Sequence, residues 1–299
     1  MIKRYNMKRF PVFISVISLL FIAAFGFISC GGTPPPPIQA PEPPPPPPPQ
    51  PPKATAPELS VSLSPRYFSP DGDGVDDELI AVITCRSETP IDEWKIEIRE
   101  PEPPNLTFFE VSGKDNPPPQ LVWDGRSASG ELVQSASDYP FTMTVKNTGG
   151  MSATYNGKIE TDVLVIRDGN KLRVQVPSIV FGSNSGGFTG IDNSTLSNND
   201  AILRRIAQTL NKFDTYKVIV EGHANATAAT EAARRTENQR ELLPLSAQRA
   251  RYVMDYLIRL GVDSKRLSSV GVGSERPVVP YSDRNNWWKN RRVEFILEK

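Results

Sequence analysis

The chain has 299 residues, of which 38% are hydrophobic, and its formal net charge is zero. This length allows two ordinary domains with real cores once any extensions are removed. The thirty prolines are too many for one compact fold, which excludes a chain that is folded along its whole length.

The N-terminus has the pattern of an export signal. Four basic residues within the first nine precede an apolar run over residues 10–28, which ends at "FISCGG" with Cys30. This stretch resembles a bacterial lipoprotein signal, although Phe27 stands where the usual motif has Leu. The resemblance predicts a signal peptide over residues 1–29 and lipidation of Cys30. The alternative is an uncleaved anchor, because the run is close to the ~20 residues that a spanning helix needs.

A proline-rich segment follows over residues 30–57. Its prolines can build neither a helix nor a hydrogen-bonded ladder, so we expect extended polyproline II, a semi-rigid spacer between the membrane and the folded part. Apart from Cys30 the chain has only Cys85, so lipidation would leave no intramolecular disulfide.

Residues 58–165 have the pattern of an all-β domain. Runs such as "LSVSLSP" and "YPFTMTVKN" alternate with period two, and turn-forming clusters separate them, which is typical of a sandwich. The stretches "YFSPDGDGVDDEL" and "LVWDGRSASGELVQSASDYPFTMTV" resemble the immunoglobulin-like modules of flagellar hook-capping and adhesin proteins. The resemblance implies an immunoglobulin-like sandwich with a protein partner of its own.

The acidic turn of this region contains Asp71, Asp73, Asp76 and Asp77. Carboxylates at alternate positions suit calcium, but the EF-hand spacing fails, since Val75 stands at its fifth position. We therefore favour a turn in which Asp side chains cap backbone amides.

From residue 166 onward the pattern becomes α/β. Helical stripes over 194–213 and 245–261 alternate with strand patterns in the order β-α-β-α-β-β, which predicts two helices packed on a mixed sheet. Ser246 is the expected N-cap of the second helix, and Gly261 is its expected stop. Residues 166–299 carry more basic than acidic residues, which suits an anionic partner, and export argues against nucleic acid.

This C-terminal segment resembles the OmpA-like peptidoglycan-binding domain of spirochaete-type lipoproteins. The resemblance rests on "VPSIVF", "VEGHAN", "LSAQRA", "VGVGSERPV" and "NRRVEF", which occur in that order. It implies a site that holds the free diamino-acid end of the peptidoglycan stem peptide. In the family, an Asp after the strand takes the ammonium and the Arg of "LSAQRA" takes the carboxylate, a pairing that charge-assisted hydrogen bonds favour.

Carried onto this chain, the Arg role falls on Arg249 and the Asp role falls on Asn225. An amide accepts a hydrogen bond without contributing charge, so we expect peptidoglycan binding to be weakened, retuned to a different diamino acid, or lost. The loss of the charge corresponds to about ten-fold in affinity. Arg291 and Arg292 each have two readings, as a ligand contact or as a partner of acidic neighbours, and Arg292 is the weakly preferred ligand contact. The long segment between residues 225 and 245 is expected to be a partly helical insertion over the mouth of the site.

Reaction chemistry finds little support. His223 is the single histidine, so it is expected to be a turn residue bonded to backbone, and neither metal nor cofactor is predicted. The predicted function is that of a non-enzymatic lipoprotein, anchored in the outer membrane and facing the periplasm, which tethers the envelope to peptidoglycan. The alternative is an envelope scaffold that no longer binds peptidoglycan and docks protein partners through the immunoglobulin-like domain.

Overall fold

The computed structural model describes residues 55–299, which belong to one compact unit, Pro52–Lys299. The predicted signal peptide, Cys30 and nearly all of the proline-rich spacer lie outside the described residues. Within residues 55–299, no helix is both long and apolar enough to span a bilayer.

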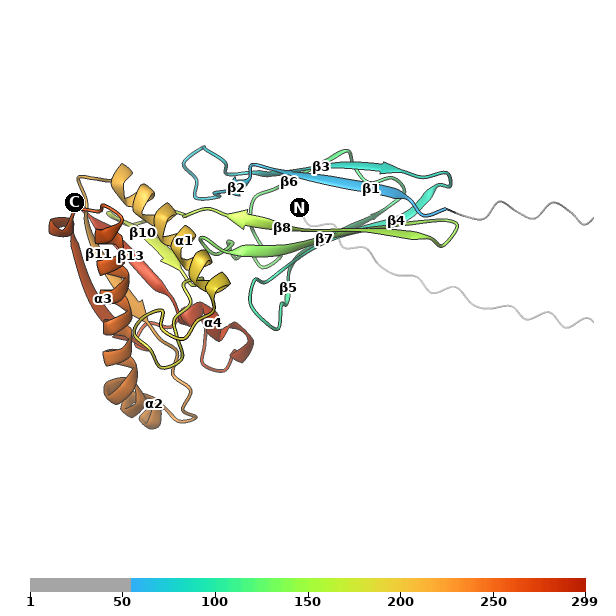
Figure 1. Cartoon of the computed structure of the whole chain (residues 1–299). Helices are drawn as coiled ribbons and strands as arrows, with labels where there is room; N and C mark the ends of the chain where they lie inside the picture. Colours follow the sequence, from blue (N-terminus) through green and yellow to red (C-terminus); the bar gives the residue numbers. More distant parts are fainter. Residues whose placement is uncertain (1–54) are drawn as a thin grey trace, which may run out of the picture. The chain divides into compact units, whose positions relative to one another are not determined.

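The first part of the described chain is rich in β-strands, as predicted for residues 58–165 (Figure 1). One sheet has the order β1-β3-β6 and the other β2-β8-β7-β4-β5. Neighbouring strands are antiparallel except for the parallel pair β2–β8. The strands are β1 Glu58–Ser64, β2 Tyr67–Phe68, β3 Leu79–Arg86, β4 Ile91–Arg99, β5 Thr107–Lys114, β6 Gln120–Trp123, β7 Asp138–Asn147 and β8 Ser152–Thr161.

The two sheets share one hydrophobic core. Along β7, Phe141, Met143 and Val145 are buried in it, while the threonines between them lie on the opposite face. This alternation is the period-two pattern of the sequence, because successive strand side chains point to opposite faces. Cys85 is a free, partly buried thiol that packs against the same core.

The acidic turn is organised by its own carboxylates. Asp77 accepts hydrogen bonds of 2.7 Å from the amides of both Gly72 and Gly74. Asp71 accepts one of 2.9 Å from the amide of Val165. The turn thus has the backbone capping that the sequence predicts, and the carboxylates of Asp71, Asp73 and Asp77 also lie within 4.8 Å of one another.

The second part is an α/β domain with a mixed five-stranded sheet of order β12-β11-β13-β10-β9. Strands β11 and β12 are parallel, and the other neighbours are antiparallel. The main elements are β9 Ile166–Asp168, β10 Lys171–Val176, α1 Asn193–Lys212, β11 Lys217–His223, α2 Glu231–Glu237, α3 Leu243–Arg259, β12 Leu267–Gly273, α4 Trp287–Asn290 and β13 Val293–Glu298.

Helices α1 and α3 cover one face of this sheet, as predicted (Figure 1). Ile202, Ile206 and Leu210 of α1 are fully buried against it, as are Val253 and Leu257 of α3. Three- and four-residue spacing places these side chains on one stripe of each helix. Helix α3 stops where expected, at Gly261 in the left-handed region with φ 93°.

The start of α3 differs from the prediction. Ser246 is not the N-cap, because the helix begins at Leu243 and continues from the helical turns of residues 231–242 without a break. Its hydroxyl instead accepts a 2.9 Å hydrogen bond from the amide of Gly273 and donates to the carbonyl of Leu243. Ser246 thus fastens α3 to the end of β12.

The β-rich region and the α/β domain share buried contacts. Ala136 and Val163 belong to the hydrophobic core of the α/β domain. The ammonium of Lys289 lies 2.8 Å from a carboxylate oxygen of Glu100 and 2.6 Å from one of Glu131, and the Lys289 side chain is only 3% exposed.

Candidate functional site

The candidate site forms where β11 ends, β13 begins and α3 passes close to both. A Cβ atom on Gly222 would lie 2.1 Å from the carbonyl oxygen of Ser246. Only glycine allows the helix backbone to approach the strand this closely. The Gly before His223 therefore sets the position of the first turns of α3, which carry Arg249.

A cavity of about 430 Å³ opens at this point. It brings together three residues that the sequence singled out, His223, Arg249 and Arg292. Asn225 is not among its lining residues. The cavity is lined by Glu102, Pro177, Ile179, Val180, Phe181, Gly182, Ser183, Asn184, Gly222, His223, Arg249, Trp288, Arg291, Arg292 and Val293.

Arg249 projects from α3 and is held by the loop that follows β10. Its Nε donates a 3.1 Å hydrogen bond to the carbonyl of Ser185, and its guanidinium lies 4.9 Å from the ring centre of Phe181. Burial, together with the charge of Arg291, lowers the pKa of Arg249. Its two terminal nitrogens have no hydrogen-bond partner among residues 55–299, so these donors are free to face a ligand.

Arg292 lies deeper, with 5% of its surface exposed. Its Nε donates to Glu294 at 2.6 Å and its Nη2 donates to the carbonyl of Arg276 at 3.1 Å. Its Nη1 is buried without a partner in the described part of the chain. Both predicted readings of Arg292 therefore have a structural basis, since one side of the guanidinium pairs with Glu294 and one donor remains unsatisfied.

Asn225 is only 6% exposed, and its amide is used within the protein. Its Nδ2 donates to the carbonyl of Ala226 and its Oδ1 accepts from Asn290, both at 2.8 Å. Asn290 also accepts hydrogen bonds from the amides of Val278 and Val279. Asn225 is thus one part of a buried amide network beside the cavity.

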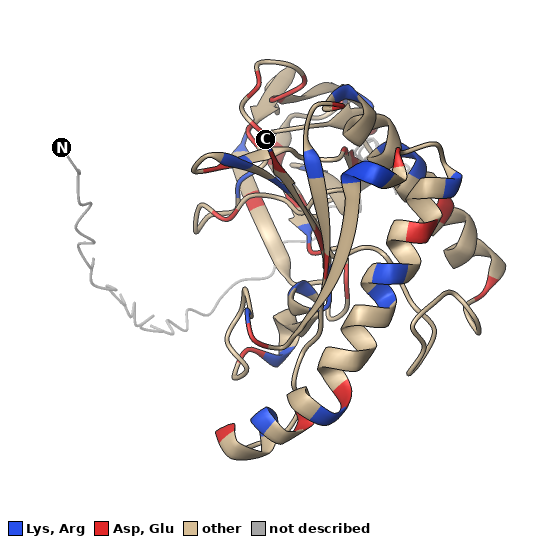
Figure 2. Cartoon of the chain, turned by 90° about the vertical axis from the view of Figure 1, so that its left-hand side faces the viewer, with Lys and Arg blue, Asp and Glu red and all other residues tan. Residues whose placement is uncertain are grey.

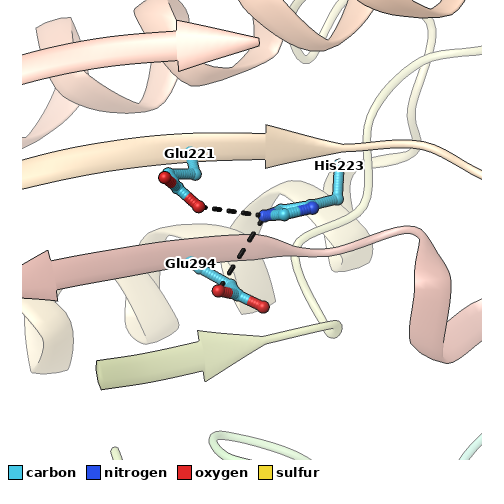
Figure 3. A group of neighbouring side chains, drawn as sticks. All are labelled: Glu221, His223 and Glu294. Carbon is cyan, nitrogen blue, oxygen red and sulfur yellow. Dashed lines mark ion pairs between the residues drawn. The ribbon is translucent and has the colours of Figure 1, made fainter. Parts of the chain in front are cut away.

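His223 has surroundings that differ from the expected backbone-bonded turn. Figure 3 shows its ring between two carboxylates, with Nε2 3.4 Å from Glu221 and 3.9 Å from Glu294. Neither ring nitrogen has a hydrogen-bond partner in residues 55–299. Burial lowers the pKa of His223, and the nearby carboxylate of Glu221 acts in the opposite direction.

His223, Glu221 and Glu294 lie close enough to hold a metal ion in principle. However, Arg276 is 2.7 Å from Glu221, and Arg292 and Arg173 lie 2.6 Å and 3.8 Å from Glu294. The contacts with His223 and Arg276 outweigh burial and hold the pKa of Glu221 at about 2. Because these guanidiniums already balance the carboxylates, the group is an ion-pair network rather than a cation site.

The segment between Asn225 and Leu245 is helical, as predicted, but it does not cover this cavity. Its helix α2 and the following π-helical turn, Asn238–Leu242, contribute no lining residue. The segment packs instead around Tyr281, over whose ring Arg234 lies at 4.9 Å. Trp288 lines the cavity and is buried, while Trp287 donates to the carbonyl of Tyr281, so the two tryptophans serve packing.

Figure 2 shows Lys and Arg mixed with Asp and Glu over the visible face. The concentration of positive charge that the structure does provide is local, at the cavity with Arg249, Arg291 and Arg292.

Comparison with known proteins identifies the domain that carries this cavity. Residues 190–291 match the model of the OmpA family. The peptidoglycan-associated lipoprotein of Mesorhizobium japonicum is 38% identical over 111 residues, which are 37% of this chain and 61% of that protein. The protein of the same name from Rhizobium meliloti is 37% identical over 97 residues, 32% of this chain and 50% of its own. The C-terminal part of the chain is therefore an OmpA-like domain, homologous to that of peptidoglycan-associated lipoproteins.

The chain spans between half and about three fifths of the length of these two relatives. The peptidoglycan-binding protein ArfA of Mycobacterium tuberculosis is 33% identical over 96 residues, 32% of this chain and 27% of that protein. Among solved structures, the periplasmic domain of Helicobacter pylori MotB is 24% identical, with 45% of this chain and 78% of that chain covered and a TM-score of 0.37. The immunoglobulin-like assignment of the β-rich region stays a prediction.

Of the residues that line the cavity, Glu102 was missed by the sequence analysis as a ligand candidate, and Arg291 was ranked below its neighbour. Arg291 is exposed at the cavity rim, although "NRRVEF" gave Arg292 the preference. Glu102 belongs to the β-rich region, 147 positions before Arg249 in the chain. No spacing in the sequence could have placed it here, because only the packing of the two regions does so.

Proposed function

We propose that this chain is an outer-membrane lipoprotein, lipidated at Cys30, whose OmpA-like domain binds the stem peptide of peptidoglycan. The proline-rich segment would span the distance between the membrane and the wall. The role is that of a non-catalytic tether, and the names of the relatives, peptidoglycan-associated lipoprotein and peptidoglycan-binding protein, support it.

One observation carries the proposal. The cavity presents unsatisfied guanidinium donors on Arg249 and Arg292, and the Nη1 of Arg292 is buried. A buried donor without a partner costs about 1–3 kcal/mol, which a ligand carboxylate would recover. The planar fork of a guanidinium suits a carboxylate in particular, and the free end of a stem peptide carries one.

The alternative of an envelope scaffold is favoured by one feature, the state of Asn225. This residue replaces the Asp of the family, and its amide is already bonded to Asn290 and Ala226. Without an acceptor for the ligand ammonium the cavity would bind weakly, and protein partners of the β-rich region would then define the function.

The test is co-sedimentation with purified peptidoglycan. The exported chain would carry Cys30→Ser, so that no lipid contributes to pelleting. We expect the protein to pellet with the polymer, and Arg249→Ala to weaken binding by roughly 10- to 100-fold, the effect of about 1.5–3 kcal/mol for a charged hydrogen-bonding group.

The matched control is Arg251→Ala. Arg251 lies on the same helix, and its exposed side chain pairs with Asp255 at 3.4 Å. The Arg251→Ala variant loses the same charge outside the cavity, so it should pellet like the parent protein. Failure of the parent to pellet, or equal losses for both variants, would reject the cavity as the peptidoglycan site and favour the scaffold.

A further inference from the structure

The cavity with Arg249 is not built from the OmpA-like domain alone. Glu102, in the turn between β4 and β5 of the β-rich region, is one of its lining residues. Among the residues of the range 55–299 that line the cavity, Glu102 is the single carboxylate, and three arginines belong to the same lining.

The turn that carries Glu102 is held in shape by its own hydrogen bonds. The amide of Glu100 donates to the carbonyl of Leu106 at 2.8 Å, and the amide of Asn105 donates to the carbonyl of Glu102 at 2.9 Å. The side chain of Asn105 closes the turn further by donating to the carbonyl of Glu100 at 2.9 Å.

The same turn is fastened to the OmpA-like domain beside the cavity. Glu100 forms the buried ion pair with Lys289, whose neighbour Trp288 lines the cavity. The contact is buried on both sides, with Lys289 3% and Glu100 6% exposed. The position of Glu102 at the cavity is therefore fixed by the hydrogen bonds of its turn and by the buried ion pair between Glu100 and Lys289.

The charges at the rim are already coupled. Burial raises the pKa of Glu102, and the positive charge of Arg291 acts in the opposite direction. Burial likewise lowers the pKa of Arg249, and Arg291 adds to that effect. Glu102, Arg249 and Arg291 thus contribute charges of opposite sign to the lining of one cavity.

A diamino-acid end presents both a carboxylate and an ammonium, and the ammonium needs an acceptor. Asn225 is outside the cavity lining, and its amide is engaged with Asn290 and Ala226. We propose that Glu102 of the β-rich region receives the ligand ammonium while Arg249 receives its carboxylate. The inference rests on the proposed function and adds to it a ligand site composed of both parts of the chain.

The experiment uses two synthetic probes and calorimetric titration. One is a stem peptide ending in diaminopimelate with a free amine, and the other is the same peptide with that amine acetylated. The parent protein should bind the free amine about ten-fold more tightly than the acetylated form, the effect expected for one charge-assisted contact. Glu102→Gln should abolish this preference and leave the affinity for the acetylated probe unchanged.

The control is Glu110→Gln, which removes an exposed carboxylate of β5 that pairs with Lys95 at 2.7 Å. It should keep the preference, and Glu102→Asp should keep most of it, with melting temperatures equal to that of the parent. A Glu102→Gln protein that still prefers the free amine overturns the role of Glu102 but leaves the proposed function standing, provided that Arg249→Ala weakens both probes. A parent protein that binds neither probe overturns both.

Discussion

At the scale of single residues, Asn225 is the point where this chain departs from the pattern that it resembles. The structure gives the amide a definite task, because it donates to one neighbour and accepts from another inside a buried network. An Asp could keep only the second of these bonds. The surroundings of position 225 therefore favour an amide side chain, which the sequence alone did not reveal.

This environment predicts the effect of Asn225→Asp. In the parent protein the Nδ2 donor of Asn225 lies 2.8 Å from the carbonyl oxygen of Ala226, and the substitution replaces this donor with a carboxylate oxygen. It also buries a negative charge at a position that is 6% exposed. We expect a loss of about 1–3 kcal/mol in the free energy of unfolding, measured by urea denaturation. Asn156→Asp is the control, because this residue is exposed, lies outside the cavity and uses its side-chain oxygen to accept a hydrogen bond from Thr142. Unchanged stability with tighter peptidoglycan binding would show that the side chain turns toward the cavity instead.

The residue scale also shows how far motif reasoning reached. Arg249 was placed at the cavity by "LSAQRA", and its geometry there is compatible with the predicted role, which awaits its test. The two roles of Arg292 could not be separated from the sequence, since a guanidinium has several donors and only coordinates show which are taken. The arrangement of carboxylates on both sides of His223 was likewise hidden from sequence reasoning, because only strand pairing brings Glu294 next to Glu221.

At the scale of secondary structure elements, the arrangement depends on how closely α3 approaches β11 and β12. Gly222 and Gly271 both lie under the start of the helix, and a Cβ on Gly271 would lie 2.5 Å from the amide nitrogen of Ala247. The clashing atoms are backbone atoms, which cannot rotate away as a side chain would.

Gly222→Ala should therefore push α3 away from the sheet and displace Arg249 with it. We expect a loss of stability on the order of 1–3 kcal/mol, as for other overpacked sites, together with weaker peptidoglycan binding. Thermal unfolding and co-sedimentation measure the two effects. Gly157→Ala is the matched control, since its nearest contact is the movable side chain of Tyr155 at 3.0 Å. A Gly222→Ala protein that binds like the parent would mean that Arg249 does not need this helix position.

The elements themselves were largely predictable. Alternation over β7 and the helical stripes of α1 and α3 are strong local patterns, and each produced the expected element. The start of α3 was not predictable, because helical turns that lead into the helix overrode the local N-cap signal of Ser246. Tertiary continuity won over local propensity there.

At the scale of the whole described unit, the most informative contact joins the β-rich region to the OmpA-like domain. Lys289 lies between Glu100 and Glu131, and burial raises the pKa of Glu100 despite the nearby ammonium. Such a group is costly to leave unpaired. No sequence pattern indicated this pairing, because Glu100 and Glu131 are 189 and 158 positions away from Lys289 in the chain.

Lys289→Met should destabilise the unit by about 3–5 kcal/mol, because it leaves Glu100 buried without its counter-ion. Calorimetric unfolding measures the loss, and a separation of one transition into two would show that the contact couples the two regions. Lys158→Met, which removes an exposed partner of Asp138, should have little effect. Equal stability of both variants would contradict a structural role for the buried pair.

The order of strands in the OmpA-like sheet has a consequence for biogenesis. Strand β13 is the last of the sheet in sequence, yet it lies between β11 and β10 and pairs with both. The sheet therefore lacks a middle strand until residues 293–298 have been synthesised. The OmpA-like sheet can therefore be completed only after all strands of the β-rich region have been made. Arg291 and Arg292, which line the cavity and directly precede β13, are synthesised together with this strand, after Arg249 of α3.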